Sequence, residues 1–270
     1  MHVKDDSTTA VSADGTVIAY EKVGQGPPVV LVGGAFNTRD FGPNAELAPL
    51  LAEHFTVVNY DRRGRGGSGD TAPYSVAKEI EDLAAVIDTV GGSAAVYGIS
   101  SGAALALEAA RAGLPITRLA LFEAPFVVDG TRPPIPDYAA EIDALIAQGR
   151  ASQAIKLFMR QGVLVPGFVV AMMPLMPAWK HMKSLIHTLP YDVAVLGDTG
   201  RGLPLPAERY ADVTLPTLVV SGGKSPEWSR NAMAHLAGIL PSARLETLPG
   251  QTHIVKAKAL GPVLIDFLRA

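Results

Sequence analysis

The stretch that decides the fold is GISSG, residues 98–102, which lies between a short apolar run and an Ala- and Leu-rich segment. Gly-x-Ser-x-Gly between a strand and a helix is typical of a sharp turn that exposes the hydroxyl of its central serine. Glycines allow a turn at which bulkier residues would clash. The register selects Ser100, because a shift to Ser101 would need glycine at Ile99 and Ala103. A serine that only caps a helix would give the same letters, so the flanking segments have to decide.

Short apolar runs and helical patterns alternate along most of the chain. This alternation predicts an α/β fold, with a mostly parallel sheet covered by helices on both faces. An antiparallel edge hairpin is expected around Thr16–Lys22. The predicted strands are Pro28–Val32, Thr56–Asn59, Ala94–Tyr97, Leu119–Phe122, Thr217–Val220 and Arg244–Leu248. The predicted helices are Asn44–Glu53, Ser75–Thr89, Ser101–Ala112, Ser229–Leu240 and Leu260–Leu268.

Between Phe126 and Tyr210 the alternation stops, and a Pro- and Met-rich helical segment replaces it. Apolar residues have helical spacing over Asp137–Gln148 and Ala151–Gln161, and further helical turns are expected near Ala178–Thr188. We interpret residues 126–210 as a helical cap inserted into a core that consists of residues 1–125 and 211–270.

Composition excludes several classes of protein. The net charge is −3 with interspersed charges, so we expect no nucleic-acid partner. The start, MHVKDDSTTA, lacks the pattern of a signal peptide, and the absence of cysteine makes the cytoplasm the default compartment. The uncharged stretch Gly162–Trp179 contains three prolines, so we expect an apolar wall inside the protein and no membrane insertion. Oligomeric state is not indicated.

Three other segments occur in an order that agrees with the GISSG turn. PPVVLVGGAF, residues 27–36, places a Gly-rich loop directly after a strand, where a backbone N–H can face an oxyanion. VVNYDRRGRGGSG, residues 57–69, follows, and LPGQTH, residues 248–253, comes after the last predicted strand. Together with the turn, these segments resemble those of α/β-hydrolases, and the resemblance covers nearly the whole chain outside the insertion.

The resemblance implies that the oxyanion donors are the backbone N–H groups of Ala35 and Ser101. The loop differs from the family pattern at Gly33, where the family commonly has His. Because both donors belong to the main chain, this difference leaves the oxyanion hole intact in principle.

The general base is expected to be His253, because the order of the triad on this fold is Ser, then acid, then His. It is the only histidine set in a loop after the final predicted strand. His181 and His187, both in the insertion, are alternatives for a contact with the substrate.

The acid is not where α/β-hydrolases commonly have an Asp, because LVVSGG is followed by Lys224, Ser225 and Pro226. We predict Glu123 instead, since a carboxylate at the end of the apolar run LALFEAPF would be costly to bury without a partner. Glu227 and Asp129 remain alternatives. The Glu before Pro, the missing Asp, GISSGA and LPG before the histidine resemble the zearalenone lactone hydrolases.

GRGGSG, residues 64–69, also matches the dinucleotide pattern G-x-G-x-x-G. Pro73 follows soon after it, and neither the helix nor the later acidic residue of a dinucleotide site is present, so we interpret these residues as tight-turn glycines. No metal-binding motif occurs. We therefore expect a reaction without cofactor or metal.

Taken together, the residues predict a serine hydrolase that cleaves a carboxylic ester or lactone through an acyl-enzyme on Ser100. A non-hydrolytic lyase or cyclase, or a ligand-binding receptor on the same fold, is the alternative. The apolar insertion favours a bulky hydrophobic substrate, with an aromatic macrolactone as the form that the resemblance suggests. The expected substrate-binding residues are Gly34, Phe36, Phe126, Met172, Met176 and Trp179.

Overall fold

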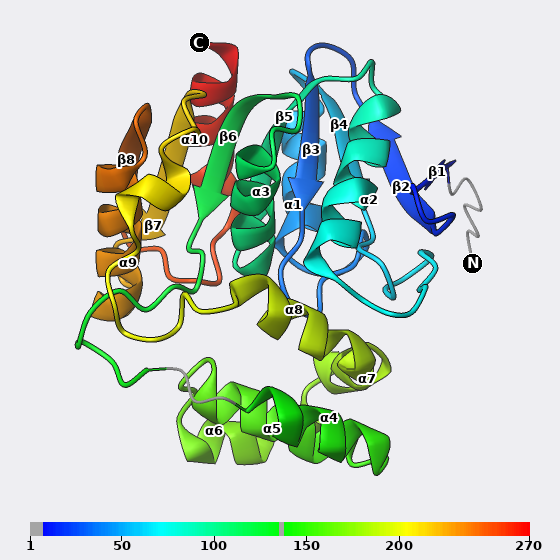
Figure 1. Ribbon diagram of the computed structural model, residues 1–270, viewed down its shortest axis with the longest axis vertical. Helices are drawn as coiled ribbons and strands as arrows, with labels where there is room; N and C mark the ends of the chain where they lie inside the picture. Colours follow the sequence, from blue (N-terminus) through cyan, green and yellow to red (C-terminus); the bar gives the residue numbers. More distant parts are fainter. Residues whose placement is uncertain (1–7, 135–137) are drawn as a thin grey trace.

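An eight-stranded, mostly parallel sheet forms the centre of the computed structural model, which describes residues 8–134 and 138–270 (Figure 1). Its strand order is β1-β2-β4-β3-β5-β6-β7-β8, and among the described residues only the pairs β1–β2 and β2–β4 are antiparallel. The strands are β1 (Thr8–Val11), β2 (Val17–Val23), β3 (Pro28–Val32), β4 (Thr56–Tyr60), β5 (Ala94–Ile99), β6 (Ile116–Phe122), β7 (Thr217–Gly222) and β8 (Ala243–Leu248). The predicted α/β fold, including the N-terminal hairpin, is confirmed.

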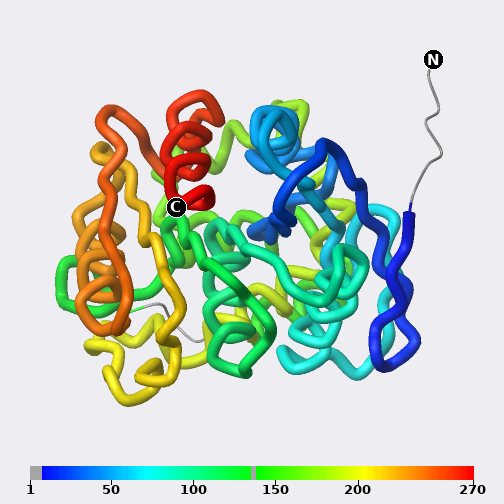
Figure 2. The backbone as a smooth tube through the Cα atoms, turned by 90° about the horizontal axis from the view of Figure 1, so that it is seen from above, coloured from blue at the N-terminus to red at the C-terminus, as the bar shows by residue number. Residues whose placement is uncertain are grey.

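Helices cover both faces of this sheet, because successive strand residues point to opposite sides and both sides are apolar. One face packs against α1 (Pro43–Leu51) and α10 (Ala257–Arg269), which lie side by side in the view from above (Figure 2). The other face packs against α2 (Val76–Asp88), α3 (Ser101–Arg111) and α9 (Glu227–Ile239). In β3, for example, Val29 and Leu31 join the first core, whereas Val30 and Val32 join the second.

The insertion is helical, and Figure 1 shows it beyond the carboxyl ends of the parallel strands. It contributes an apolar cluster of its own, to which Ile142, Ile155 and Leu189 belong. Its helices are α4 (Ala139–Ala147), α5 (Ala151–Gln161), α6 (Gly167–Met172), α7 (Ala178–Ser184) and α8 (Leu189–Leu196), with 3-10 turns η1 (Met173–Leu175), η2 (Ile186–Thr188) and η3 (Ala207–Tyr210). Helices were predicted from the sequence in the region of α4, α5 and α7, but not at α6 or α8.

Two sequence expectations fall outside the described residues. The predicted start of a helix at Asp137 lies in the gap at 135–137, and most of the segment tested for a signal peptide lies in residues 1–7. Within the described part of the chain, no helix is both long and apolar enough to cross a membrane.

The glycine-rich loop after β4 wraps around a single carboxylate. Asp61 accepts hydrogen bonds from the N–H groups of Arg39 and Gly67, at 2.7 and 2.9 Å. A Cβ atom on Gly66, whose φ is +51°, would lie 2.2 Å from Asp61 Oδ2, so only glycine fits there. The glycines of residues 64–69 are thus explained by a tight turn around Asp61, as the sequence analysis expected.

Candidate active site

Ser100 occupies a strained turn between β5 and α3. Its φ of +58° is unusual for a residue other than glycine, and its N–H donates to the Phe122 carbonyl at 2.9 Å. A Cβ on Gly98 would lie 2.4 Å from the Gly102 carbonyl oxygen, and one on Gly102 would lie 2.4 Å from the Val32 carbonyl oxygen. The two glycines therefore permit the close backbone packing around the turn. This packing presents the Ser100 side chain at the carboxyl end of the sheet.

Glu123 and His253 form a hydrogen-bonded pair beside this turn. His253 Nδ1 lies 2.8 Å from Glu123 Oε2, and the Gly222 N–H donates to Glu123 Oε1 at 2.7 Å. Glu123 follows β6 with a φ of +44° and is only 1% exposed, whereas the His253 side chain is 44% exposed. The carboxylate is thus anchored in the protein, and within the described structure the imidazole is held through Nδ1 with no hydrogen bond at Nε2.

Burial alone would raise the pKa of Glu123, because it penalises the charged carboxylate. The hydrogen bonds that the carboxylate accepts, first among them the one from His253, together with the charge of His253 outweigh that effect, and the pKa is lowered below its ordinary value. The side chain therefore carries a negative charge at neutral pH, as a partner for an imidazolium must.

The alternative acids contact other groups. Asp129 accepts a hydrogen bond from Asn231 Nδ2 at 2.8 Å and others from Thr131. Glu227 is exposed in the first turn of α9. Neither of them is hydrogen-bonded to His253 in the described structure, which leaves Glu123 as the carboxylate on the imidazole.

Histidines 181 and 187 of the insertion bind backbone carbonyl groups. His181 Nε2 lies 2.9 Å from the Phe36 carbonyl oxygen, and His187 Nε2 lies 2.9 Å from that of Gly64. Neither residue lines the cavity that contains Ser100. Their contacts connect the insertion to loops of the sheet, which is a structural role.

Ser100 and His253 line one cavity of about 180 Å³, together with Ala35, Ser101 and Glu123. Ser100 and His253 are not hydrogen-bonded to each other within the described structure; such bonds are often long without substrate and shorten when it binds. Apolar side chains form most of the remaining wall. Other lining residues are Pro125, Tyr138, Phe158, Gly162, Val163, Asp192, Val193, Leu196, Pro226, Trp228 and Ser229.

The substrate-binding residues that were predicted from the sequence do not line the cavity that contains Ser100. Phe36 and Trp179 pack in the apolar cluster of the insertion, and Phe126 is buried in the main core. Met172, the last residue of α6, and Met176, which follows η1, are 57% and 52% exposed. Gly34 is also absent from the cavity lining, although it packs directly against Ser100.

Sequence reasoning missed Trp228 and Asp192 in the wall. Trp228 lies at the start of α9, where the Arg132 guanidinium stacks 4.7 Å from its ring centre. Asp192 is buried on α8, and it is the only charged residue in LPYDVAVL. A lone carboxylate in an apolar helix was the signal that could have marked Asp192, because burial of such a group requires a partner.

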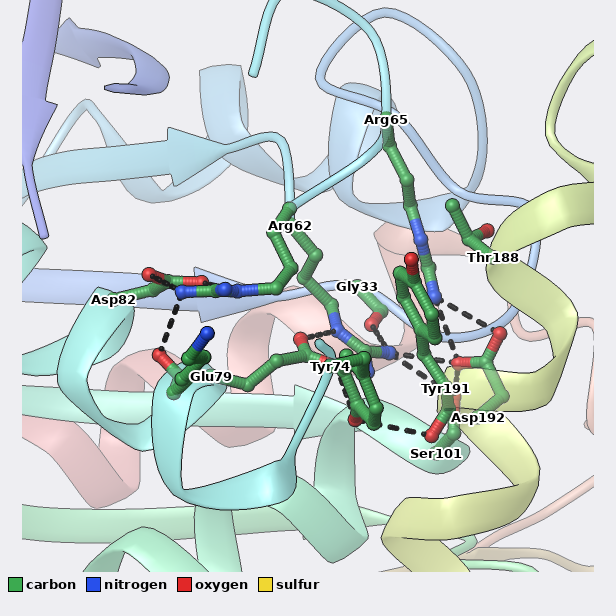
Figure 3. Close-up of polar contacts among 12 residues, drawn as sticks. Gly33, Arg62, Arg65, Tyr74, Glu79, Asp82, Ser101, Thr188, Tyr191 and Asp192 are labelled. Atoms are coloured by element: carbon green, nitrogen blue, oxygen red, sulfur yellow. Dashed lines mark hydrogen bonds and ion pairs between the residues drawn. The ribbon is translucent and has the colours of Figure 1, made fainter. Parts of the chain in front are cut away.

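Asp192 belongs to a buried network of charged groups (Figure 3). Its carboxylate accepts hydrogen bonds from Arg62, Arg65 and Ser101, at distances of 2.7 to 2.9 Å. Arg62 also binds Glu79 through two hydrogen bonds of 2.6 Å. The two arginines and two carboxylates together have no net charge, which is the condition for burying them.

No group of three or more His, Cys, Asp or Glu side chains that could hold a metal occurs among residues 8–134 and 138–270. The cavity brings together a hydroxyl, an imidazole with its carboxylate, and the backbone of Ala35 and Ser101. This combination fits acyl transfer.

Comparisons with known proteins agree with the fold. The sequence model of one family, described as "Alpha/beta hydrolase family", matches residues 29–255. The crystal structure of an alpha/beta hydrolase from Sphaerobacter thermophilus is 54% identical, covers 96% of this chain and 99% of its own, and has a TM-score of 0.90. The enol-lactonase from Burkholderia xenovorans is 22% identical, with coverage of 97% and 100% and a TM-score of 0.71.

A shorter match occurs to a Mycobacterium tuberculosis protein named "Putative non-heme bromoperoxidase BpoC". It is 31% identical over 93 residues, which are 34% of this chain and 35% of that protein. The matched segment thus spans about a third of the relative's length.

The lowered pKa of Glu123 predicts how Glu123→Gln changes stability with pH. The ionised carboxylate contributes fully above its ordinary pKa of 4.5, and the contribution is lost as the pH falls through the lower pKa of the folded state. We expect wild type to exceed Glu123→Gln by about 1.5 to 3 kcal/mol in free energy of unfolding near pH 7, as for hydrogen bonds to charged groups. Urea unfolding should show this difference shrink as the pH falls below 4.5.

Glu227→Gln is the matched control, since Glu227 is exposed and should show a difference within about 0.5 kcal/mol at either pH. A difference for Glu123→Gln that grows toward acid pH would contradict an ionised, hydrogen-bonded Glu123.

Proposed function

The chain belongs to the alpha/beta hydrolase family, and from this premise we propose that it is a serine hydrolase that cleaves carboxylic esters or lactones through an acyl-enzyme on Ser100. Membership of this family supports hydrolase activity. The single observation that carries the proposal is the position of Ser100: a positive-φ turn that opens on the cavity of the His253–Glu123 pair.

The reaction follows from the groups around the cavity. His253 Nε2 takes the proton of Ser100 Oγ as the oxygen attacks the substrate carbonyl carbon, and the N–H groups of Ala35 and Ser101 stabilise the oxyanion. The tetrahedral intermediate collapses, and the imidazolium gives its proton to the leaving alkoxide. Water, deprotonated by His253, then attacks the acyl carbon. The second tetrahedral intermediate collapses as the imidazolium returns the proton to Ser100 Oγ, which releases the carboxylic acid and regenerates free Ser100 and neutral His253.

Glu123 serves as the acid of the triad in this proposal, as the sequence predicted. Its hydrogen bond to Nδ1 keeps the proton of neutral imidazole on that nitrogen, so that Nε2 can accept the serine proton. The negative carboxylate then stabilises the imidazolium that forms. Its place after β6 supports a resemblance to the zearalenone lactone hydrolases, which itself stays a prediction.

Residues 126–210 are proposed to be the cap over the site, and residues 1–125 and 211–270 the catalytic core. Support comes from the location of the insertion helices beyond the carboxyl ends of the strands (Figure 1) and from the insertion residues in the cavity wall, among them Phe158, Val163 and Leu196. A cap in this place excludes water from the acyl-enzyme and selects the substrate.

The cavity sets a limit on the substrate. Its volume of about 180 Å³ is smaller than the roughly 300 to 1,000 Å³ typical of sites for drug-sized ligands. Its apolar wall favours an acyl group of medium size without charge. A bulky ester or an aromatic macrolactone, the substrate predicted from the sequence, requires the cap to move outward. The name of the Burkholderia xenovorans enol-lactonase, a relative by fold, agrees with a lactone.

The first test of this function is labelling with a fluorophosphonate, which phosphonylates activated serines. Wild type should be labelled at one residue, and Ser100→Ala should abolish labelling and reduce kcat for an aryl ester about 10⁴-fold or more, since it removes the nucleophile. Mass spectrometry of the labelled peptide and initial rates provide the measurements.

Ser101→Ala is the control for labelling, because it removes a neighbouring hydroxyl but keeps the nucleophile and the backbone N–H; it should still be labelled at Ser100, and its kcat should fall by at most about 100-fold. Labelling that survives in Ser100→Ala would refute the assignment. Labelling without turnover of any ester or lactone would favour the lyase, cyclase or receptor alternatives.

The second test concerns the acyl group. A butyryl group has two more CH₂ groups than an acetyl group, and each buried CH₂ contributes about 0.8 kcal/mol. The value of kcat/KM should therefore be about tenfold higher for p-nitrophenyl butyrate than for p-nitrophenyl acetate. Trp228→Ala enlarges the cavity and should reduce this ratio to about threefold or less, as measured by initial rates for both esters.

Trp179→Ala is the matched control, because Trp179 packs within the insertion and is not part of the wall. It should lower the melting temperature and leave the butyrate-to-acetate ratio within about twofold of wild type. Equal effects of the two variants on the ratio would mean that Trp228 does not select the acyl group.

A further inference from the structure

We propose that Asp192 is a positioning residue that fixes the orientation of both oxyanion donors, through Arg65 and through the Ser101 side chain. The inference rests on the proposed function, because it assigns a role at the same site. Asp192 comes from α8 of the insertion, and its partners follow two strands of the sheet, β4 for Arg62 and Arg65 and β5 for Ser101 (Figure 3). Figure 3 shows its carboxylate between Arg65 and Ser101.

Arg65 acts on the first donor through a single peptide unit. The Gly34 carbonyl and the Ala35 N–H belong to the same planar trans peptide, so they point in opposite directions. Arg65 Nη1 donates to the Gly34 carbonyl oxygen at 2.6 Å, and the Asn37 N–H donates to it at 3.2 Å. Because these contacts hold the carbonyl, they also set the direction of the Ala35 N–H.

Asp192 in turn holds the Arg65 guanidinium. Arg65 Nη2 donates to both carboxylate oxygens of Asp192, at 2.9 Å each. The donors of a guanidinium lie in one rigid plane, so fixing Nη2 also directs Nη1 toward Gly34. Arg62 Nη1 reinforces the arrangement, since it lies 2.8 Å from Asp192 Oδ1 and 3.3 Å from the Gly33 carbonyl oxygen.

The second donor is held from its side chain. Ser101 Oγ donates to Asp192 Oδ1 at 2.7 Å, which fixes the first residue of α3. The Ser100 carbonyl accepts hydrogen bonds from Ala103 and Ala104, at 2.9 and 3.2 Å. By the same trans-peptide geometry, the Ser101 N–H points away from the helix. One carboxylate therefore contacts the supports of both donors.

The charges of Asp192, Arg62 and Arg65 are also compatible with a negatively charged oxyanion nearby. Asp192 lines the cavity, so an uncompensated carboxylate there would repel the developing negative charge. Burial raises the pKa of Asp192, but the nearby Arg65 and Arg62 charges outweigh it, and the pKa is lowered. The carboxylate thus stays ionised at neutral pH, and the two guanidinium groups compensate its charge.

The test uses the full chain with the single substitutions Asp192→Asn and Arg65→Lys. Both should lower kcat for an aryl ester about 10- to 100-fold and change KM less than about threefold. The reason is that misdirected donors stabilise the transition state less but leave substrate binding unchanged. The inhibition constant of a trifluoromethyl ketone, which forms an oxyanion on serine, should rise in parallel. That of the matching methyl ketone should stay unchanged.

Asp82→Asn is the matched control. Asp82 is as buried as Asp192 and binds Arg63 through two hydrogen bonds of 2.7 Å, but Arg63 contacts neither Gly33 nor Gly34. It should lower the melting temperature and leave kcat and both inhibition constants within about threefold of wild type. If Asp192→Asn does not fold, Arg65→Lys decides the question, because it keeps the buried charge.

Two results would overturn the inference. The first is a kcat and inhibition constants for Asp192→Asn or Arg65→Lys that change as little as those of Asp82→Asn. The second is a rise in KM with unchanged kcat in either variant, which would indicate a substrate contact. Ser100→Ala in the same assay distinguishes failure of the proposed function from failure of the role proposed for Asp192. Activity retained in Ser100→Ala refutes the proposed function itself, whereas loss in Ser100→Ala with unchanged kinetics of the other two variants refutes only the role of Asp192.

Discussion

The close packing of three backbone segments around Ser100 is the constraint on which the rest of the site depends. The end of β5, the start of α3 and the loop after β3 meet where side chains are absent: a Cβ on Gly34 would lie 2.9 Å from Ser100 Cβ. This contact places the loop that contains Ala35 beside the hydroxyl of Ser100. Gly33 stands where the resemblance leads one to expect His, and the oxyanion donor proposed in this loop, the Ala35 N–H, belongs to the main chain.

Buried ionic groups complement this packing. Loss of one partner of a buried ion pair costs about 3 to 5 kcal/mol in stability. Asp192 of the insertion pairs with Arg62 and Arg65 of the loop after β4, and Arg62 also pairs with Glu79. These pairs therefore constrain the position of the insertion relative to the sheet. Burial opposes the charge on Arg62, but Glu79 and Asp192 outweigh it and raise its pKa. The network therefore persists over the pH range in which an imidazole can act as a base.

The sequence predicted those parts of the structure that depend on local pattern. The strands, the turn at Ser100 and the position of His253 after the last strand follow from periodicity and from glycine spacing. Glu123 was inferred from the cost of burying a carboxylate, and the structure has it on the imidazole. The cavity wall was not predictable in this way: whether Trp228 or Trp179 faces the site depends on how the insertion packs on the sheet, which no local pattern encodes.

The central claim is that Ser100 carries the acyl group while Ala35 and Ser101 bind the oxyanion, and a crystal structure of the fluorophosphonate adduct tests it most directly. The account predicts phosphorus bonded to Ser100 Oγ and a phosphoryl oxygen about 2.7 to 3.1 Å from both N–H groups. It also predicts that His253 Nδ1 stays hydrogen-bonded to Glu123. Phosphorus on another residue, or a phosphoryl oxygen directed away from Ala35 and Ser101, would contradict it.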